Sequence, residues 1–315
     1  MNLTTIIWAS NSIWQASYWC QWTSDQNVIN SAISKWGTIF LLAWDYYVSS
    51  AIDINIPIRI VWETWTNIIT TWNNIWLSVA SNNVVLENIN IDWLSQTNWD
   101  NTCRCIDIVS VDNVHIINCK AYNWWYYWFN IYQCNYCVFD RCHWFNNFRH
   151  WYHWWWDANW RNIWNVCCNS FAYWNWVDWF NDRWYWWTPE IWVFEQPNKY
   201  ISLHSYNNTG TWIVLYKCYR WNIANCYSNN NLKWIIMLEC INCNLSNSHS
   251  IWNSIDWVMI KDCVWCIINW CQSISNSVWV NTNLSNDSIV TSCISTWNTT
   301  NYAITWLWNV IQNNI

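Results

Sequence analysis

The sequence predicts an all-β fold: a right-handed, single-stranded parallel β-helix, which is a solenoid of about 22–23-residue coils with a short N-terminal capping helix. Three observations predict it. One residue position, called the slot here, recurs at this spacing. Apolar residues occupy fixed positions after each slot, and the N-terminal segment has the pattern of a capping helix. Short strands in such a repeat can pair only with the coils before and after them, about 4.8 Å away.

The N-terminal segment predicts the capping helix. Thr23, Ser24 or Asp25 can cap it. A bare terminal coil would expose unpaired strand edges and core side chains. The apolar residues that would cover the open end are Val28, Ile29, Ala32 and Ile33.

The slot marks the successive coils. Neighbouring slots are 23 residues apart at first and 22 or 23 apart from Trp212 onward, with a last interval of 27. A leucine-rich repeat has a similar period, but its regular leucine pattern is absent. The slots are Cys105, Trp128, Trp151, Trp212, Trp234, Trp257, Trp279 and Trp306.

Apolar residues follow each slot in two columns. Those one and three places after the slot point inward, which is the alternation of a half-buried strand; Ile106 and Ile108 are examples. A second column, eleven places after the slot, predicts a second strand in every coil. It contains Ile116, Phe139, Ile223, Leu245, Ile268 and Val290.

The 17 cysteines keep the same register. We interpret them as stacked buried thiols, because Ser248, Ser285 and Ser288 fill equivalent places in other coils. Disulfides are one alternative, and a metal site is another because three Cys-x-x-Cys pairs resemble zinc ligands. The pairs are Cys134 with Cys137, Cys240 with Cys243, and Cys263 with Cys266.

Tryptophan is abundant where glycine is scarce. The chain has 40 Trp and 2 Gly, whereas average usage is roughly 7% Gly. Trp also stands in predicted turns, as at Trp36, Trp176, Trp221 and residues 154–156. We hypothesise that the gene uses UGA for glycine and that its translation wrote Trp; a truly Trp-rich, sugar-stacking protein is the alternative.

Composition narrows the class of protein. The net charge of −6, with 13 Lys and Arg in 315 residues, disfavours a nucleic-acid partner. No apolar run is long enough for membrane insertion, and residues 1–7 lack the pattern of a signal peptide.

We predict a single elongated β-helix domain over residues 1–315. Residues 1–70 would form the N-terminal strand, capping helix and entry coils, and residues 71–151 regular coils. Residues 152–211 would form irregular coils with inserted loops, and residues 212–315 regular coils again. Residues 310–315 read as a half-coil without an obvious cap, which a further capping domain or a partner chain, as in a homotrimer, would cover.

With Trp read as glycine in turns, the entry segment resembles that of pectate-lyase-superfamily β-helix proteins. The resemblance rests on the Asp25 helix with Ala32-Ile33, on Gly37-Thr38-Ile39 with the following Leu41 and Tyr46, and on the corner around Trp62. With the coils it covers essentially the whole chain. It implies the fold more than the activity, because that superfamily includes lyases, hydrolases, epimerases, adhesins and phage tail proteins.

Charged residues gather in residues 152–211, and irregular loops on a rigid scaffold commonly carry function. The candidate catalytic residues are His153, Asp157, Asp178, Asp182 and Arg183. Counting from the slots places a polar strip on the outward face of the first strand, beside these loops. Its candidate substrate-binding residues are Asp107, Asn130, Tyr132 and Asn181.

The resemblance implies two chemistries. In β-helix lyases an Arg or Lys takes the proton α to a uronate carboxylate while Asp-bound Ca²⁺ neutralises it; Arg183 with Asp178 or Asp182 fits this scheme. In β-helix hydrolases paired carboxylates act as acid and base, for which Asp157 is a further candidate. The hydrolase family's motifs are not reproduced, and we predict no dedicated metal site; Ca²⁺ enters only if the protein is a lyase.

Two functions follow as expectations. One is a polysaccharide lyase or glycoside hydrolase acting on an extended glycan. The other is a noncatalytic cell-surface adhesin or phage tail-like protein. Both make a polysaccharide or surface glycan the partner, and both place the protein outside the cell, at the cell surface or on a virion.

Overall fold

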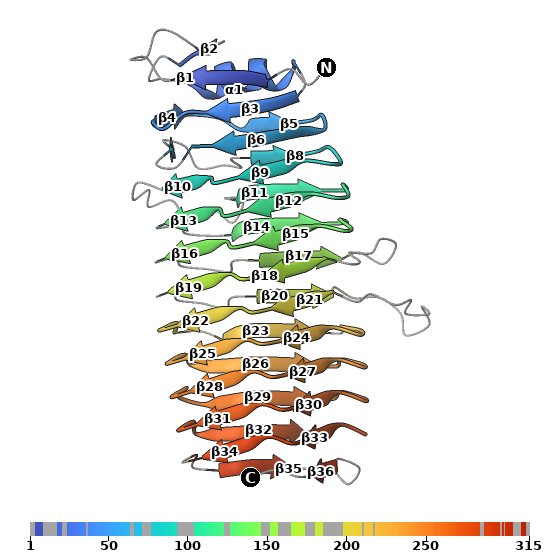
Figure 1. Ribbon diagram of the computed structural model, residues 1–315. Helices are drawn as coiled ribbons and strands as arrows, with labels where there is room; N and C mark the ends of the chain where they lie inside the picture. Colours follow the sequence, from blue (N-terminus) through green and yellow to red (C-terminus); the bar gives the residue numbers. More distant parts are fainter. Residues whose placement is uncertain are drawn as a thin grey trace.

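The computed structural model shows the predicted right-handed parallel β-helix, in which successive coils stack into three long sheets, called A, B and C here (Figure 1). Every strand pairing among the described residues is parallel, and each coil passes through sheets C, A and B in turn. The structure describes residues 4–8, 18–20, 24–35, 37–63, 66–70, 77–92, 104–122, 127–145, 152–156, 165–173, 180–184, 198–209, 211–216, 218–283, 287–296, 298, 300–304 and 310–312.

Sheet A has 14 strands, including the two strands that precede the helix. In spatial order they are β2 (Tyr18–Trp19), β1 (Thr4–Trp8), β3 (Gly37–Leu41), β6 (Ile58–Trp62), β9 (Val85–Glu87), β12 (His115–Ile117), β15 (Val138–Asp140), β18 (Val166–Cys168), β21 (Lys199–Ile201), β24 (Asn222–Ala224), β27 (Asn244–Ser246), β30 (Ile267–Asn269), β33 (Ile289–Thr291) and β36 (Val310–Gln312).

Sheets B and C have 11 strands each. Sheet B contains β4 (Asp45–Val48), β7 (Asn67–Thr70), β10 (Asn90–Asp92), β13 (Lys120–Tyr122), β16 (His143–Phe145), β19 (Phe171–Tyr173), β22 (His204–Tyr206), β25 (Tyr227–Asn229), β28 (His249–Ile251), β31 (Gln272–Ile274) and β34 (Ile294–Thr296). Sheet C contains β5 (Ile52–Ile54), β8 (Leu77–Val79), β11 (Arg104–Val109), β14 (Tyr127–Tyr132), β17 (Tyr152–Trp156), β20 (Phe180–Trp184), β23 (Thr211–Tyr216), β26 (Lys233–Leu238), β29 (Asp256–Lys261), β32 (Val278–Asn283) and β35 (Thr300–Ile304).

Both predicted apolar columns are confirmed. In sheet C, the residues one and three places after the slot are fully buried, as Ile106, Ile108, Ile235 and Met237 show. In sheet A, the column eleven places after the slot is at most 1% exposed, from Ile116 to Val290. These columns meet in one continuous core that runs along the solenoid.

The third strand of each coil, in sheet B, was not predicted. Its inward column begins with Tyr46, Ile68 and Ile91, includes Ala121 and Ala172, and then changes to serine. Because serine is not apolar, the column gives no hydrophobic signal although it is fully buried. The serines of this column with no exposed surface are Ser205, Ser228, Ser250 and Ser273.

Each of these serines is partnered by the asparagine three residues later. Asn231 Nδ2 donates to Ser228 Oγ at 2.7 Å, and Asn276 Nδ2 donates to Ser273 Oγ at 2.7 Å. The asparagine Oδ1 atoms accept from the backbone N–H of the preceding coil, as from Asn231 N to Asn253 Oδ1 at 2.8 Å. The Ser-x-x-Asn ladder therefore satisfies buried polar groups in the turn between sheets B and C.

The turns between sheets place one residue per corner in the left-handed region. Asparagine is the commonest occupant, since its short polar side chain tolerates φ > 0. Three tryptophans share these positions: Trp252, Trp265 and Trp270, with φ of 53°, 55° and 53°. Their side chains are 62%, 54% and 67% exposed, so they contribute little to the core.

The other described tryptophans of the predicted turns are buried or lie in strands, and Trp36 and Trp176 lie outside the described residues. Trp221 is 1% exposed, and its ring lies 5.0 Å from that of Tyr200. Trp62 is also fully buried, and residues 154–156 belong to strand β17. Trp221 does lie in the turn before β24, although it is buried. The turn prediction was wrong for residues 62 and 154–156, because they belong to strands β6 and β17.

The cysteines form the predicted ladders. All 16 cysteines in the described part of the chain are free thiols, and all except Cys168 are buried. Cys240 Sγ donates to Leu215 O of the preceding coil at 3.4 Å, and Cys226 N donates to Ser248 Oγ at 3.1 Å, so serine and cysteine share a ladder. Among the described residues no group of three or more possible metal ligands occurs.

The capping helix is α1 (Gln26–Ile33), and Ile29, Ala32 and Ile33 are buried as expected. Asp25 is the N-cap residue but makes no side-chain cap hydrogen bond. Its Oδ2 instead accepts from Tyr47 N at 2.8 Å. Gln26 Oε1 and Asn30 Oδ1 accept in the same way from Ser49 N and Asp53 N. The helix thus satisfies open N–H groups of the first coil as well as covering its apolar end.

The structure differs from the predicted repeat in two details. Val280 pairs with Tyr302, so Asn301 occupies the last slot and the assignment of Trp306 was wrong. The three sheets also continue without interruption through residues 152–211. The additional residues of this region stand in the sequence between a strand of sheet C and the next strand of sheet A: β17 ends at residue 156 and β18 begins at 166, and β20 ends at 184 and β21 begins at 199.

Candidate functional site

A polar column runs along the outer face of sheet C. The strand register aligns Asp107 with Asn130, Asn130 with His153, and His153 with Asn181. These four predicted residues come from the successive strands β11, β14, β17 and β20. Parallel in-register pairing therefore brings together residues up to 74 positions apart in the sequence.

A second outward column lies two residues further along the same strands. Tyr132 aligns with Trp155, and Trp155 aligns with Arg183. The additional residues between sheets C and A follow this column in the sequence, after the ends of β17 and β20. Tyr132 and Arg183 therefore stand on the same face as the polar column, at the edge beside the inserted residues.

The remaining candidates are placed differently. Asp182 aligns with Leu215, in the inward column that also contains Ile131, and both of these neighbours are fully buried. This register favours Asn181 and Arg183 over Asp182 for contact with a ligand. Asp157 and Asp178 lie outside the described residues.

Asp107 and Asn130 form a shielded polar pair. Asn130 Nδ2 donates to Asp107 Oδ1 at 2.6 Å across strands β14 and β11. Asp107 is 8% exposed and Asn130 3%, although their register positions face outward. A carboxylate held in this way keeps a fixed orientation, because a charge-assisted hydrogen bond is stronger than a neutral one.

The outer face changes character after β20. Asn181 aligns with Val214, followed by Ile236 and Met259, before Asn281 restores a polar residue. Ile236 and Met259 are half-buried, whereas their neighbours in the same strands, Ile235 and Val258, are fully buried. The outer face of sheet C is therefore polar near its middle and aliphatic in the next three coils.

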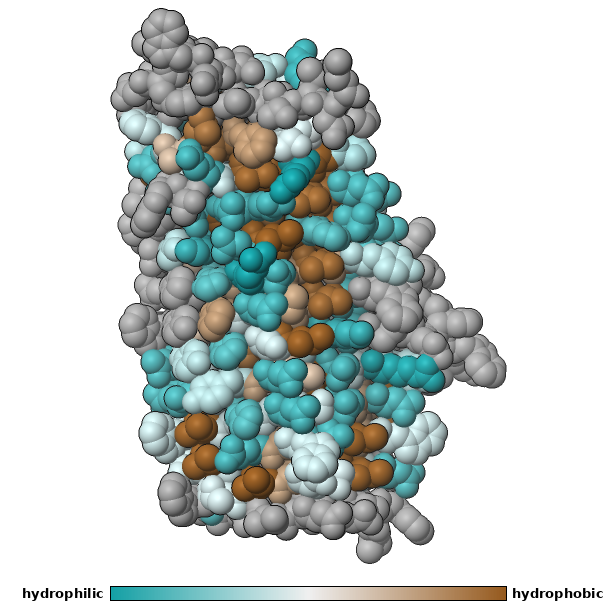
Figure 2. Space-filling model, in the orientation of Figure 1, coloured by the Kyte–Doolittle hydropathy of each residue, from teal (hydrophilic) through white to brown (hydrophobic). Residues whose placement is uncertain are grey.

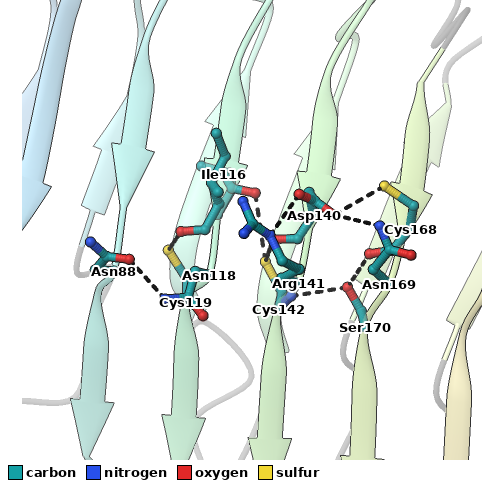
Figure 3. A network of polar contacts seen from close by, with 11 residues as sticks. Asn88, Ile116, Asn118, Cys119, Asp140, Arg141, Cys142, Cys168, Asn169 and Ser170 are labelled. Atoms are coloured by element: carbon teal, nitrogen blue, oxygen red, sulfur yellow. Dashed lines mark hydrogen bonds and ion pairs between the residues drawn. The ribbon is translucent and has the colours of Figure 1, made fainter. Parts of the chain in front are cut away.

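A polar network on sheet A lies apart from this face (Figure 3). The carboxylate of Asp140 accepts from Arg141 Nε and Asn169 Nδ2, both at 2.9 Å, and from Cys168 Sγ at 3.4 Å. Partial burial alone would raise the pKa of Asp140, but these hydrogen bonds lower it below its usual range. Burial and the nearby Asp140 carboxylate raise the pKa of Cys168 to about 12, so its thiol stays protonated. We regard this cluster as a turn-stabilising network.

An aromatic row on sheet B was missed by sequence reasoning, which had no strand there. Phe171 lies between His143 and His204 with ring centroids 4.8 Å apart on each side; its ring is tilted against His143 and stacked on His204. Burial, together with the positive charge of Lys120, lowers the pKa of His143 to about 4. Burial also lowers the pKa of His204, in strand β22. The three residues are 28 and 33 positions apart in the sequence, so the 22–23-residue repeat did not reveal the row.

Solved structures share this fold. The A-module of the Azotobacter vinelandii mannuronan C-5 epimerase AlgE4 is 12% identical with a TM-score of 0.61, over 91% of this chain and 96% of that one. The periplasmic alginate epimerase AlgG is 10% identical with a TM-score of 0.59, over 88% and 76%. The Streptococcus pneumoniae surface adhesin PfbA is 10% identical with a TM-score of 0.50, over 92% and 84%.

At these identities the likeness shows the parallel β-helix fold alone. No protein-family model matches the sequence, and no curated protein matches it. In the part of the chain that the structure describes, no helix is long and apolar enough to cross a membrane.

Proposed function

We propose that this chain is a carbohydrate-active β-helix protein that binds an extended glycan along sheet C and removes the proton next to a uronate carboxylate. The observation that carries the proposal is the polar column Asp107, Asn130, His153 and Asn181, flanked by Tyr132 and Arg183. Coils lie about 4.8 Å apart, which is comparable to the length of one sugar unit. A glycan parallel to the solenoid axis would therefore meet one polar side chain per sugar.

The residue types suit proton abstraction. A base removes the proton from the carbon beside the carboxylate, and the electron pair that is left is delocalised into that carboxylate. Expulsion of the neighbouring glycosidic oxygen then gives an unsaturated sugar, as in a lyase, whereas return of a proton from the opposite face gives an epimer. We assign binding of the sugar carboxylate to Arg183 and base catalysis to His153, with Tyr132 as the second proton-transfer group. Asp107 and Asn130 would orient the sugar hydroxyls.

Two alternatives follow from the same face. A glycoside hydrolase needs two carboxyl groups at the substrate, but Asp107 alone supplies one among the described outward residues from β8 to β20. A noncatalytic adhesin or tail-like protein would bind a glycan without product. The similarity to the epimerases named above supports the enzymatic proposal, and the similarity to PfbA keeps binding without turnover as the alternative.

Calcium does not enter the proposed steps. The described residues gather no group of three or more possible metal ligands, and Asp107 Oδ1 already accepts from Asn130. Of the two carboxylates that the lyase scheme would use, Asp178 lies outside the described residues and Asp182 aligns with the inward Leu215. We therefore assign neutralisation of the substrate carboxylate to the Arg183 guanidinium.

A panel of polymers tests the function. Polymannuronate, polygalacturonate and a neutral α-1,3-glucan are incubated with the protein in D₂O. Ultraviolet absorbance reports unsaturated products, a reducing-end assay reports hydrolysis, and deuterium incorporation reports epimerisation. We expect turnover of a polyuronate, and a loss of about 10²–10⁴-fold in kcat for His153→Ala.

Matched variants separate the site from the scaffold. Arg183→Ala should raise KM, whereas Arg59→Ala, which removes an exposed ion pair with Glu87 on sheet A, should leave kcat and KM unchanged. His249→Ala on sheet B is the control for His153. Saturated reducing ends from the neutral polymer would instead identify a hydrolase, and binding without any product would identify an adhesin.

This function places the protein where extended glycans occur, outside the cell, at the cell surface or on a virion. A homotrimer or an additional capping domain stays part of the proposal. Sedimentation of the purified chain would measure the oligomeric state directly.

The polypeptide itself is proposed to carry glycine at several positions written as Trp. Trp252, Trp265 and Trp270 are exposed at φ > 0, where an L-residue with a bulky side chain costs about 1–2 kcal/mol and glycine does not. Peptide mass spectrometry of the protein from its native host would show glycine there if UGA is recoded. Trp at all three positions would refute the recoding, and the same spectra would identify the buried residues 62 and 221.

A further inference from the structure

The aliphatic stretch of sheet C lies directly beyond the polar column. Ile236 and Leu238 occupy the two outward positions of β26, and Met259 occupies the first outward position of β29. All three are half-buried, whereas the inward residues between them are fully buried. Val214 occupies the same column in β23. The stretch covers three coils, or roughly 10 Å along the axis.

This stretch is a poor surface for an unmodified polyuronate. Sugar hydroxyls and carboxylates placed against Ile236 and Met259 would lose water without gaining a hydrogen-bond partner, which is unfavourable. A small apolar substituent would instead be stabilised by leaving water. The chain places Asn130, Asn181 and Asn281 elsewhere in this same column, so the strand geometry does not require aliphatic residues there.

We infer that Ile236 and Met259 form a subsite for sugar units that carry a small apolar ester, either an acetyl group on a hydroxyl or a methyl group on the carboxylate. The inference rests on the proposed function, because the glycan must continue from the polar column along the solenoid axis. Because the outward column continues without a break from Asn181 to Val214, a glycan bound along the polar column would also cross the aliphatic stretch. Lys261 follows Leu238 in the neighbouring column, where its ammonium group would meet a free carboxylate beyond the ester.

Paired polymers test the subsite. Binding is measured by isothermal titration calorimetry for acetylated and deacetylated polymannuronate, and for methyl-esterified and de-esterified polygalacturonate. Each buried methyl group should strengthen binding by about fourfold, so the preferred esterified polymer should bind at least about fourfold more tightly. The two pairs distinguish acetyl from methyl esters.

Two variants locate the preference. Ile236→Asn and Met259→Asn place in this column the residue that it already contains at 130, 181 and 281, so the fold should tolerate them. Each should reduce the ratio of the two Kd values toward one, because the ester loses its apolar contact and the free hydroxyl or carboxylate gains a hydrogen-bonding side chain. Ile201→Asn, a half-buried residue on the outer face of sheet A, is the matched control and should preserve the ratio.

The outcomes separate this inference from the proposed function. If the protein binds and converts a de-esterified polyuronate but shows no ester preference, the subsite is refuted and the proposed function stands. If the ester preference persists in both asparagine variants, another surface is responsible and the inference is overturned. If no polyuronate binds, with or without esters, both proposals fail together.

Discussion

Asn130 donates a 2.6 Å hydrogen bond from Nδ2 to Oδ1 of Asp107, on the outer face of sheet C. The two residues are 23 positions apart in sequence, which is one coil of the solenoid. Both are less than a tenth exposed, so the bond joins two shielded polar groups rather than two solvated ones. Such a pair is expected to matter for stability as well as for ligand orientation.

Asn130→Ala should therefore destabilise the fold. Removing the amide leaves the Asp107 carboxylate with one hydrogen bond fewer in a shielded position, which costs about 1–3 kcal/mol. Chemical denaturation monitored by circular dichroism would measure the free energy of unfolding. Asn222→Ala is the control, because Asn222 is only half-buried and accepts a 3.2 Å bond from Asn244. Equal losses in the two variants would contradict the assignment.

The Ser-x-x-Asn ladder should be a major contributor to stability in the last coils. Asn253 is 2% exposed, its Oδ1 accepts from Asn231 N at 2.8 Å, and its Nδ2 donates to Ser250 Oγ. Asn253→Ala leaves a buried N–H and a buried hydroxyl without these bonds, and should cost about 2–3 kcal/mol. Ser254→Ala, one residue further at an exposed position, should change stability by less than about 0.5 kcal/mol.

The stacked row on sheet B should make stability fall in mild acid. Burial and Lys120 lower the pKa of His143 to about 4, from an ordinary value of 6.5. The unfolded chain therefore binds a proton first, and the stability present above pH 6.5 is lost as the pH falls toward 4. His143→Phe keeps a ring against Phe171 and removes the proton-binding group.

The free energy of unfolding of His143→Phe should consequently depend less on pH in this window than that of the original chain. Urea denaturation at several pH values would measure it. His249→Phe, at an exposed position of the same row, provides the matched comparison. An unchanged pH slope in His143→Phe would show that His143 is not responsible.

The cysteine ladders predict a large difference in thiol reactivity between the folded and unfolded chain. All 17 cysteines should react with a disulfide reagent in guanidinium. The native protein should react slowly, because the described thiols other than Cys168 are buried and Cys168 stays protonated. Fewer than 17 reactive thiols in guanidinium without reductant would indicate disulfides, and rapid native reaction would contradict the packing.

Sequence reasoning predicted two of the three sheets because their inward columns are apolar at a fixed interval. Ile116 and Phe139 could be aligned by counting alone, and the structure buries both. The third sheet could not be found in this way, because Ser228 and Ser250 look like surface residues until their asparagine partners are seen. Hydrophobic pattern detects buried apolar groups, whereas a buried polar ladder is stable only through hydrogen bonds that the fold supplies.

The sequence by itself determined the coil length, the inward residues of sheets A and C, the cysteine ladders and the capping helix. It also suggested that Asp107, Asn130, His153 and Asn181 share one face, because the slot fixes the register. Only the tertiary structure decided that Asp182 aligns with the buried Leu215, that Asn301 rather than Trp306 occupies the last slot, and that α1 satisfies the first coil's backbone. The physical reason is that the repeat encodes position within a coil, whereas the pairing of irregular coils depends on hydrogen bonds between distant strands.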